Sequence, residues 1–328
     1  MDIIEANKII ASDPKHAREP HDARYEDGSA FTQGRVRPIN EGMVPIQDMG
    51  FIHADAAYDV VSASGGYIFR LEDHLKRFNR SCEKFRLKNP YSDDETKDIL
   101  VSCVRKAGLK DAYIWWAVTR GRAPKDRTKP AFDFQFYAYV TPYSFIFDDD
   151  TRRRGAHVNV SASYERISPR SVDPTAKNFH WMDMKLSLLD AYEKGAEWSV
   201  LANSEGNLTE APGCNVFLIK DGVIRTPATG CLEGITRQTV IDLAAETNVP
   251  LEVTDIPAAE LAEADEAFLT STAGGIMPVS IVDNVALGGR NGPGKITTQL
   301  HNLYWTKRWD GWLGTPIEYP AHQEPADN

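Results

Sequence analysis

The sequence predicts a mixed α/β protein of the α+β type, built from two lobes. Three observations support this prediction. The chain has 328 residues, which at about 150 residues per domain indicates two domains. Its first half is rich in short strand-like runs, whereas strands and helices alternate in the second half. A charge-dense connector without apolar side chains, with aspartates at 148–150 and arginines at 152–154, separates the halves.

These observations divide the chain into five segments. We expect an N-terminal extension over residues 1–30, a small α/β domain over 31–147, an interdomain linker over 148–155, a large α/β domain over 156–316 and a disordered tail over 317–328. The linker is expected to be a solvated loop. The polar N-terminal extension fits either a short packed helix or a frayed end, because chain termini are often poorly ordered.

Local signals predict the elements of the first half. A double glycine at 65–66 between two apolar runs indicates a hairpin. Apolar residues spaced three and four apart predict a helix over residues 71–85. A capping box of Ser92 and Glu95 starts the next helix, which ends at Gly108. Strands are expected over residues 112–119 and 132–140.

The second half alternates between strands and helices. Asp221-Gly222 predicts a hairpin turn, and a helix is expected to begin near Thr236. The remaining elements are strands over residues 158–162, 216–219, 223–225, 251–253 and 266–270 and helices over 184–196 and 295–312.

Composition excludes several classes of protein. The longest apolar run, residues 112–118, is far shorter than the roughly 18 residues that span a bilayer, and the N-terminus does not resemble a secretory signal. Four cysteines without a CxxC pair argue against a disulfide scaffold and a metal site. The net charge of −10 argues against nucleic-acid binding. We therefore expect a cytoplasmic protein.

Lys177 is the first residue with chemical potential. It lies in an aromatic-flanked stretch between a predicted strand and a predicted helix. Amines in apolar surroundings have a depressed pKa and readily form Schiff bases. Chemistry alone does not favour Lys177 over Lys185, which lies close by in the sequence.

Two glycine-containing segments suit a phosphate group. Gly234, Ile235 and Thr236 begin a predicted helix, whose free amide groups and dipole attract anions. Residues 271–275, a Ser-Thr-Ala-Gly-Gly run, follow a predicted strand and offer hydroxyl groups and close backbone approach. Either segment alone is typical of ordinary turns. Together, in the same half of the chain, they favour a phosphorylated ligand.

Glu210 is the fourth feature and precedes a predicted strand. A carboxylate can keep a pyridine nitrogen protonated, which makes a pyridoxal ring an electron sink. An ordinary surface acid in a turn would fit the same sequence.

Taken in order, these features resemble the fold-type IV pyridoxal-phosphate enzymes, the branched-chain and D-amino-acid aminotransferase family. The resemblance covers residues 34–312 and implies the two-lobed fold of that family, with pyridoxal 5′-phosphate as cofactor. It implies that Lys177 forms the Schiff base and that Glu210 contacts the pyridine nitrogen. The phosphate contacts implied by the resemblance are Arg77, Ile235, Thr236 and Thr272.

One branch of the family matches best. Residues 53–62, 178–181 and 272–278 resemble the (R)-selective amine transaminases, and the Phe-Glu-Gly motif of branched-chain enzymes is absent. A substrate amine without a carboxylate needs an apolar pocket. The implied pocket residues are His53, Tyr58, Val60, Tyr113, Trp115, Trp181 and Ala273. Packing within a strand would also explain Tyr113, Trp115 and Trp116, and we expect at least one of the three to be core.

The acceptor, a keto acid such as pyruvate, carries a carboxylate. The family binds it with an arginine on a mobile loop, because a guanidinium can donate two parallel hydrogen bonds to a carboxylate. Here Asp126 falls where that arginine aligns most simply. Arg127 is our candidate and Arg122 the second choice, while His53 is expected to shape the carboxylate side.

The resemblance thus implies ping-pong transfer of an amino group from a primary amine, or D-alanine, to a keto acid or ketone, with Lys177 as the general base. It also implies a homodimer or an assembly of dimers. Three alternatives stay open: a D-amino-acid or branched-chain amino acid transaminase, a lyase of the aminodeoxychorismate type, and a non-catalytic protein that binds pyridoxal phosphate.

Overall fold

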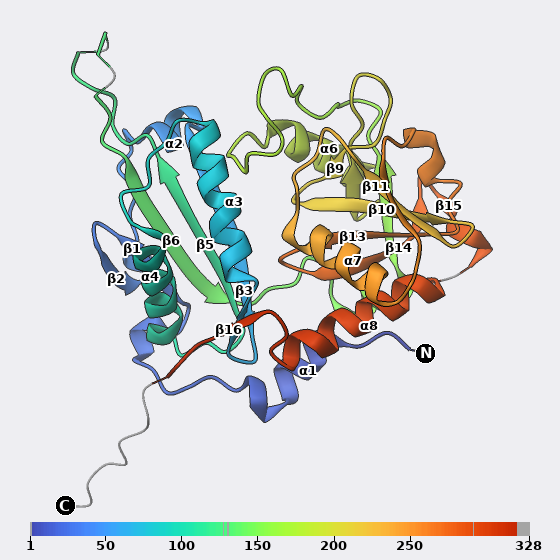
Figure 1. Cartoon of the computed structure of the whole chain (residues 1–328), viewed down its shortest axis with the longest axis horizontal. Helices are drawn as coiled ribbons and strands as arrows, with labels where there is room; N and C mark the ends of the chain where they lie inside the picture. Colours follow the sequence, from blue (N-terminus) through green and yellow to red (C-terminus); the bar gives the residue numbers. More distant parts are fainter. Residues whose placement is uncertain (1, 127, 130, 291, 320–328) are drawn as a thin grey trace, which may run out of the picture.

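The chain folds into two lobes, each built around one β-sheet (Figure 1). In the computed structural model, residues 2–126, 128–129, 131–290 and 292–319 are described. Within these residues the first sheet has the strand order β16-β4-β3-β5-β6-β1-β2. The second sheet follows β12-β11-β10-β13-β14-β7-β8, with β15 beside β14 and β9 beside β10. The predicted two-lobed, mixed α/β architecture is confirmed.

The strands of the first sheet pair antiparallel. They are β1 (Ser29–Thr32), β2 (Arg35–Pro38), β3 (Ala56–Ser64), β4 (Tyr67–Phe69), β5 (Ala112–Thr119), β6 (Gln135–Pro142) and β16 (Gly314–Pro316). Helices α3 (Leu71–Lys84) and α4 (Asp93–Lys106) cover one face of this sheet, where Phe78 and Leu100 share a core with Trp116. Trp116 is fully buried, so at least one of the three aromatic residues is core, as expected.

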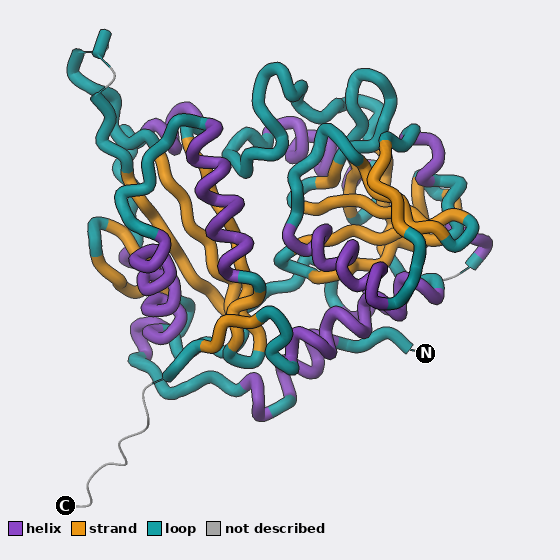
Figure 2. Tube along the Cα trace, in the orientation of Figure 1, coloured by secondary structure: helices purple, strands orange, loops and turns teal. Residues whose placement is uncertain are grey.

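The second sheet mixes parallel and antiparallel pairs. Its strands are β7 (Ala156–Val160), β8 (Trp198–Val200), β9 (Glu210–Ala211), β10 (Cys214–Lys220), β11 (Val223–Pro227), β12 (Leu251–Thr254), β13 (Glu266–Ser271), β14 (Gly275–Val282) and β15 (Val285–Ala286). Helix α6 (Met182–Glu193) adjoins β8. Helices α7 (Ile235–Glu246) and α8 (Lys295–Trp309) bury Leu243 and Leu300 with Phe217 and Phe268 of the sheet. Figure 2 shows these helices beside the orange strands of the second lobe.

Local signals located most elements well. The hairpin at residues 65–66 and the strand over 112–119 are confirmed. The capping box of α4 is present, since the Ser92 hydroxyl accepts from the amide of Glu95 and the Glu95 carboxylate accepts from the amide of Ser92. Strand β6 begins at Gln135 instead of residue 132, and α8 ends at Trp309 instead of residue 312.

The prediction of a solvated linker over residues 148–155 is wrong. Helix α5 (Asp149–Arg154) occupies it, and the Asp148 carboxylate caps the helix by accepting from the amide of Thr151 at 2.8 Å. Acidic residues in the first turn and arginines in the last turn complement the helix dipole. Arg152 is fully buried and lies over the ring of Phe145, so this segment is part of the packed structure.

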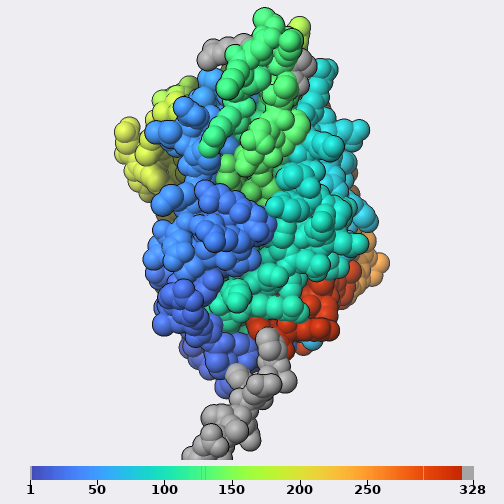
Figure 3. All heavy atoms as spheres, turned by 90° about the vertical axis from the view of Figure 1, so that its left-hand side faces the viewer, coloured from blue at the N-terminus to red at the C-terminus, as the bar shows by residue number. Residues whose placement is uncertain are grey.

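The N-terminal extension is folded over its described residues. Helix α1 (Ala6–Ser12) contacts α5, and the Asp149 carboxylate accepts from the amide of Asn7. Further along, the imidazole of His16 lies 2.8 Å from the carboxylate of Asp111, and both side chains are buried. The frayed-end alternative is therefore wrong. In the space-filling view the blue N-terminal residues lie against the first lobe (Figure 3).

The C-terminal boundary also differs from the prediction. Strand β16 pairs with β4 of the first sheet, so the second lobe does not extend to residue 316. Ile317 is buried in the first core, and the Tyr319 hydroxyl donates to the carbonyl of Leu109. The predicted disorder is wrong for residues 317–319, because Ile317 and Tyr319 pack against core residues of the first lobe that are distant in sequence. Residues 320–328 lie outside the described residues.

The described residues can be searched for disulfides, membrane-spanning helices and metal-binding clusters. The four cysteines are free and buried. None of the helices among the described residues combines the length and apolarity needed to cross a membrane. The same residues contain no group of three or more side chains placed to hold a metal ion.

We predict that Ser92→Ala lowers the free energy of unfolding by about 1 kcal/mol, because the first turn of α4 loses its cap. Urea denaturation measures this change. Ser204→Ala, at an exposed turn, is the matched control and should leave the unfolding midpoint unchanged. Equal shifts in both variants would contradict the prediction.

Candidate active site

One cavity of about 270 Å³ draws its lining from both lobes. Eleven of the site residues implied by the resemblance line it: Tyr58, Val60, Arg77, Tyr113, Lys177, Trp181, Glu210, Ile235, Thr236, Thr272 and Ala273. They come from β3, α3 and β5 of the first lobe and from the loop before α6, β9, α7 and the loop after β13 of the second. Residues separated by more than 200 positions in the sequence therefore share one site.

Two expected pocket residues lie elsewhere. Trp115 lies behind the lining, with its ring stacked on Tyr58 and Tyr139 at 5.9 and 5.1 Å. His53 is exposed at the end of the short helix α2 (Met49–His53) and lines a separate hollow, because Asp48 ties the start of that helix to the outer end of the first sheet. The prediction that His53 lines this cavity is wrong for a single chain.

The structure does not place either loop arginine where it could bind the carboxylate of a keto acid. Arg127, our first candidate, lies outside the described residues. Arg122, the second choice, is exposed and its backbone bridges to Asp48, and it is not part of the cavity lining.

Lys177 is fixed by its own backbone at the contact between the lobes. Its amide donates to the Ser81 hydroxyl at 3.0 Å, and its carbonyl accepts from the amide of Tyr58 at 3.1 Å. The amine lies 4.5 Å from the centre of the Tyr58 ring. Burial, together with the positive charge of Arg77, lowers the pKa of Lys177 to about 8. Lys185 is exposed on α6, so burial separates two lysines that local chemistry left equivalent.

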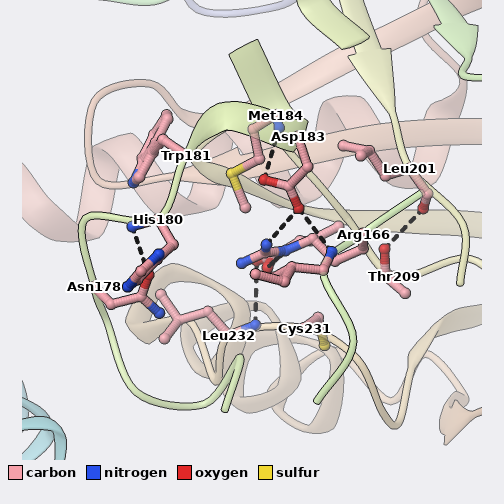
Figure 4. Close-up of polar contacts among 12 residues, drawn as sticks. Arg166, Asn178, His180, Trp181, Asp183, Met184, Leu201, Thr209, Cys231 and Leu232 are labelled. Carbon is pink, nitrogen blue, oxygen red and sulfur yellow. Dashed lines mark hydrogen bonds and ion pairs between the residues drawn. The ribbon is translucent and has the colours of Figure 1, made fainter. Parts of the chain in front are cut away.

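Glu210 presents a buried carboxylate to the cavity. One oxygen accepts from Nε of Arg166 at 2.8 Å, and the other accepts from the amide of Leu232 at 3.2 Å. Burial raises the pKa of Glu210, and the charge of Arg166 opposes that rise. Figure 4 shows Arg166 beside Asp183. Arg166 carries no recognisable signal in the sequence, because nothing in its local pattern shows that it pairs with a carboxylate 44 positions away.

Arg77 is held by a carboxylate inside the first lobe. Its Nε and Nη2 donate to the two oxygens of Asp59 at 2.8 and 2.6 Å, and its remaining Nη1 lies 3.5 Å from the carbonyl of Glu233. The buried His74 also contacts Asp59 at 2.8 Å. Burial lowers the pKa of His74, so its ring is neutral at pH 7. Asp59 was missed too, although an aspartate inside a buried strand could have indicated it.

The two glycine-containing segments meet at the same cavity. Gly234 precedes α7, and the amides at the start of that helix have no partners within the helix. A Cβ atom on Gly234 would lie 2.0 Å from the side-chain oxygen of Asn215, so only glycine fits there. Thr272 and Ala273 approach from the end of β13. This arrangement provides amides, hydroxyl groups and the Arg77 guanidinium for an anion.

A buried amine, a buried carboxylate and an anion site thus surround one cavity, and comparison with known proteins explains the combination. A sequence profile of the amino-transferase class IV family matches residues 56–282. The chain belongs to the class IV aminotransferases. It is a pyridoxal 5′-phosphate-dependent aminotransferase. The residues present fit this cofactor, since Lys177, Glu210 and Arg77 supply complementary groups to one cavity.

Individual relatives are similar over most of their length. A branched-chain-amino-acid aminotransferase of Pseudomonas aeruginosa is 32% identical over 78% of this chain and 83% of its own. A D-alanine aminotransferase of Listeria innocua is 30% identical over 82% of this chain and 92% of its own. The solved structure of the branched-chain amino acid aminotransferase of Thermobaculum terrenum, in its pyridoxal-phosphate form, has a TM-score of 0.79 and 26% identity over 90% and 99% of the two chains.

We predict that pyridoxal 5′-phosphate attaches to the apoprotein faster as pH rises, with a plateau above a pH of about 8. Only the neutral amine attacks an aldehyde, and with a pKa of about 8 roughly a tenth of Lys177 is neutral at pH 7. Borohydride trapping followed by mass spectrometry measures the rate at this site. Lys185→Ala should keep the profile. A rate that climbs without a plateau to pH 10, as for an exposed lysine, would refute the prediction.

Proposed function

We propose that this aminotransferase is an (R)-selective amine transaminase, which moves an amino group from a primary amine, or from D-alanine, to a keto acid or ketone such as pyruvate. The observation that carries the proposal is the aromatic wall of the cavity. Tyr58 and Val60 of β3 form a buried cluster with Ala117 of β5. The partly buried residues that pack against this cluster are Tyr113, Trp115, Phe179 and Trp181.

Contacts within the wall make it rigid. The indole N–H of Trp181 donates to the Tyr58 hydroxyl at 3.1 Å. Tyr58 stacks on Trp115, and Phe179 meets Tyr58 edge-on at 5.6 Å. Burial raises the pKa of Tyr58, so its hydroxyl stays neutral at any physiological pH. A rigid, uncharged aromatic surface suits an aryl or alkyl group better than a carboxylate.

The cavity's arginines are already paired. Arg77 is bound to Asp59, and Arg166 is bound to Glu210 and to Asp183. Arg166 is engaged on both sides, and the remaining Nη1 of Arg77 is assigned to the phosphate. Neither guanidinium is therefore left to bind the carboxylate that every amino acid substrate would carry. This favours a donor amine without a carboxylate. The preference for the (R) form rests on the resemblance of residues 53–62 and 178–181 to that branch of the family.

The roles of the site residues follow from their chemistry. Bound pyridoxal phosphate supplies an electron sink for the bond that breaks at the substrate's Cα. Lys177 binds the cofactor, and its amine, once released, takes the Cα proton as a general base. Glu210 holds the proton on the ring nitrogen. The phosphate is held by Arg77, Thr272 and the amides of Ile235 and Thr236 at the start of α7.

The alternative is an amino acid transaminase, specific for D-amino acids or branched-chain amino acids. The relatives named as D-alanine and branched-chain-amino-acid aminotransferases support it. Lys185 and His180 at the cavity lining offer nitrogen donors to a carboxylate.

We predict that (R)-1-phenylethylamine converts the bound cofactor to its aminated form at least about 100-fold faster than the (S) form does, equivalent to about 2.7 kcal/mol in activation free energy. Purified holoenzyme is mixed with each amine, with D-alanine and with L-leucine, and the loss of the cofactor's visible absorbance band is followed. A response to D-alanine alone or to L-leucine alone would favour the alternative. A protein that binds the cofactor and reacts with no amine would be a non-catalytic binder.

We also propose that the enzyme is a homodimer. Within the described residues, two apolar surfaces are exposed: residues 43–52, including Ile46 and Phe51, and one face of α6, formed by Met182, Leu186, Leu189 and Tyr192. Helices α2 and α6 lie in the upper part of Figure 1, one on each lobe. Apolar patches of this kind mark protein interfaces. The family resemblance makes a second copy of the chain the expected partner.

We predict a particle of twice 36.6 kDa by size-exclusion chromatography with light scattering. Leu189→Lys places a charge in the apolar face of α6 and should shift the protein toward the monomer. Val285→Lys, at an equally exposed valine on β15, is the control and should stay dimeric. A monomeric wild-type protein, or a dimeric Leu189→Lys variant, would sink this proposal.

A further inference from the structure

Asp183, the second residue of α6, contacts the cavity residue Arg166. One of its carboxylate oxygens accepts from Nη1 of Arg166 at 2.6 Å and from the amide of Ile167 at 2.7 Å. Its other oxygen accepts from the amide of Met184 at 2.9 Å. Asp183 does not line the cavity. Figure 4 shows the dashed contacts that run from Asp183 to Arg166.

The same guanidinium faces Glu210 on its other side. Nε of Arg166 donates to Glu210 at 2.8 Å, and the side chains of Arg166 and Glu210 are each 5% exposed. The three groups form a row of formal charges, negative, positive and negative, with a sum of −1. Burial opposes the charge of Arg166, but the two carboxylates outweigh it and raise the pKa of the guanidinium.

This row of charges determines the field that Glu210 exerts on the cavity, because a buried ion pair is neutral as a whole. A Glu210–Arg166 pair by itself would cancel much of the field that Glu210 exerts on a neighbouring group. The charge of a second carboxylate on the same guanidinium offsets that cancellation. The contact geometry also fixes the guanidinium, since each carboxylate engages a different nitrogen of a planar, rigid group.

We propose that Asp183 is a positioning residue that offsets the charge of Arg166, so that Glu210 keeps a net negative charge toward the cavity and stabilises a proton on the ring nitrogen of bound pyridoxal phosphate. This inference rests on the proposed role of Glu210. It assigns to Asp183 an electrostatic function in addition to its contacts with the backbone of Ile167 and Met184.

Solid-state NMR of holoenzyme carrying pyridoxal phosphate labelled with ¹⁵N in the ring tests the proposal, because the ¹⁵N shift distinguishes a protonated from a neutral pyridine nitrogen. We expect the protonated signal in the wild type at neutral pH and its loss in Asp183→Asn. The amide of the variant can still accept from Ile167 and Arg166, so mainly the charge is removed. Asp190→Asn, on the same helix but paired with Lys194, is the matched control and should retain the protonated signal.

A double variant distinguishes an electrostatic role of Asp183 from a purely structural one. If Asp183 acts by offsetting Arg166, then Asp183→Asn combined with Arg166→Gln should recover the protonated signal, whereas a merely structural role would not be rescued by a second loss. Asp183→Glu should retain the signal. A protonated nitrogen in Asp183→Asn, or a neutral one in the double variant, overturns the inference. If the single variant does not fold, the double variant and Asp183→Glu decide by the same criteria.

A further variant distinguishes failure of this inference from failure of the proposed function. Glu210→Gln removes the carboxylate itself and should lose the protonated signal. If Glu210→Gln loses it while Asp183→Asn keeps it, only the role of Asp183 is wrong. If Glu210→Gln keeps it, the proposed role of Glu210 is wrong as well.

Discussion

The backbone pairing of Lys177 with the first lobe is the interaction on which the site depends. Its carbonyl accepts from the amide of Tyr58 and its amide donates to Ser81, while the next residue, Asn178, bridges to Ala57. A segment of the second lobe is thereby attached to β3 and α3 of the first. The amine is fixed at the contact between the lobes, where burial and the charge of Arg77 depress its pKa. Arg77, Glu210 and Thr272 line the same cavity around this amine.

Paired charges are the second constraint. An unpaired buried ion is costly, and breaking a buried pair exposes that cost. The two arginines of the cavity lining therefore lie in networks, with Arg77 on Asp59 and Arg166 between Glu210 and Asp183. These networks orient the groups that face the cofactor before it binds. They also leave the aromatic wall at Tyr58 as the surface available to an uncharged substituent.

Sequence patterns located the elements whose signals are local. The capping box at Ser92 and the double glycine at 65–66 fix their own ends, because the atoms that make the contacts are a few residues apart. The segments at 148–155 and 317–319 were misjudged. Their order comes from Arg152 over Phe145 and from Ile317 in the first core, contacts between residues distant in sequence that no local pattern records.

The sequence by itself determined the two-lobed class, the family and the order of Lys177, Glu210 and Arg77 along the chain, because residue types at set separations are visible without a structure. Only the tertiary structure showed that Lys177 is buried whereas Lys185 is exposed, removed His53 from the cavity of a single chain and revealed the ion pairs of Asp59, Arg166 and Asp183. The physical reason is that burial and ion pairing depend on contacts between elements that are distant in sequence. Packing of the two lobes creates these contacts, and the spacing of residues along one segment does not reveal them.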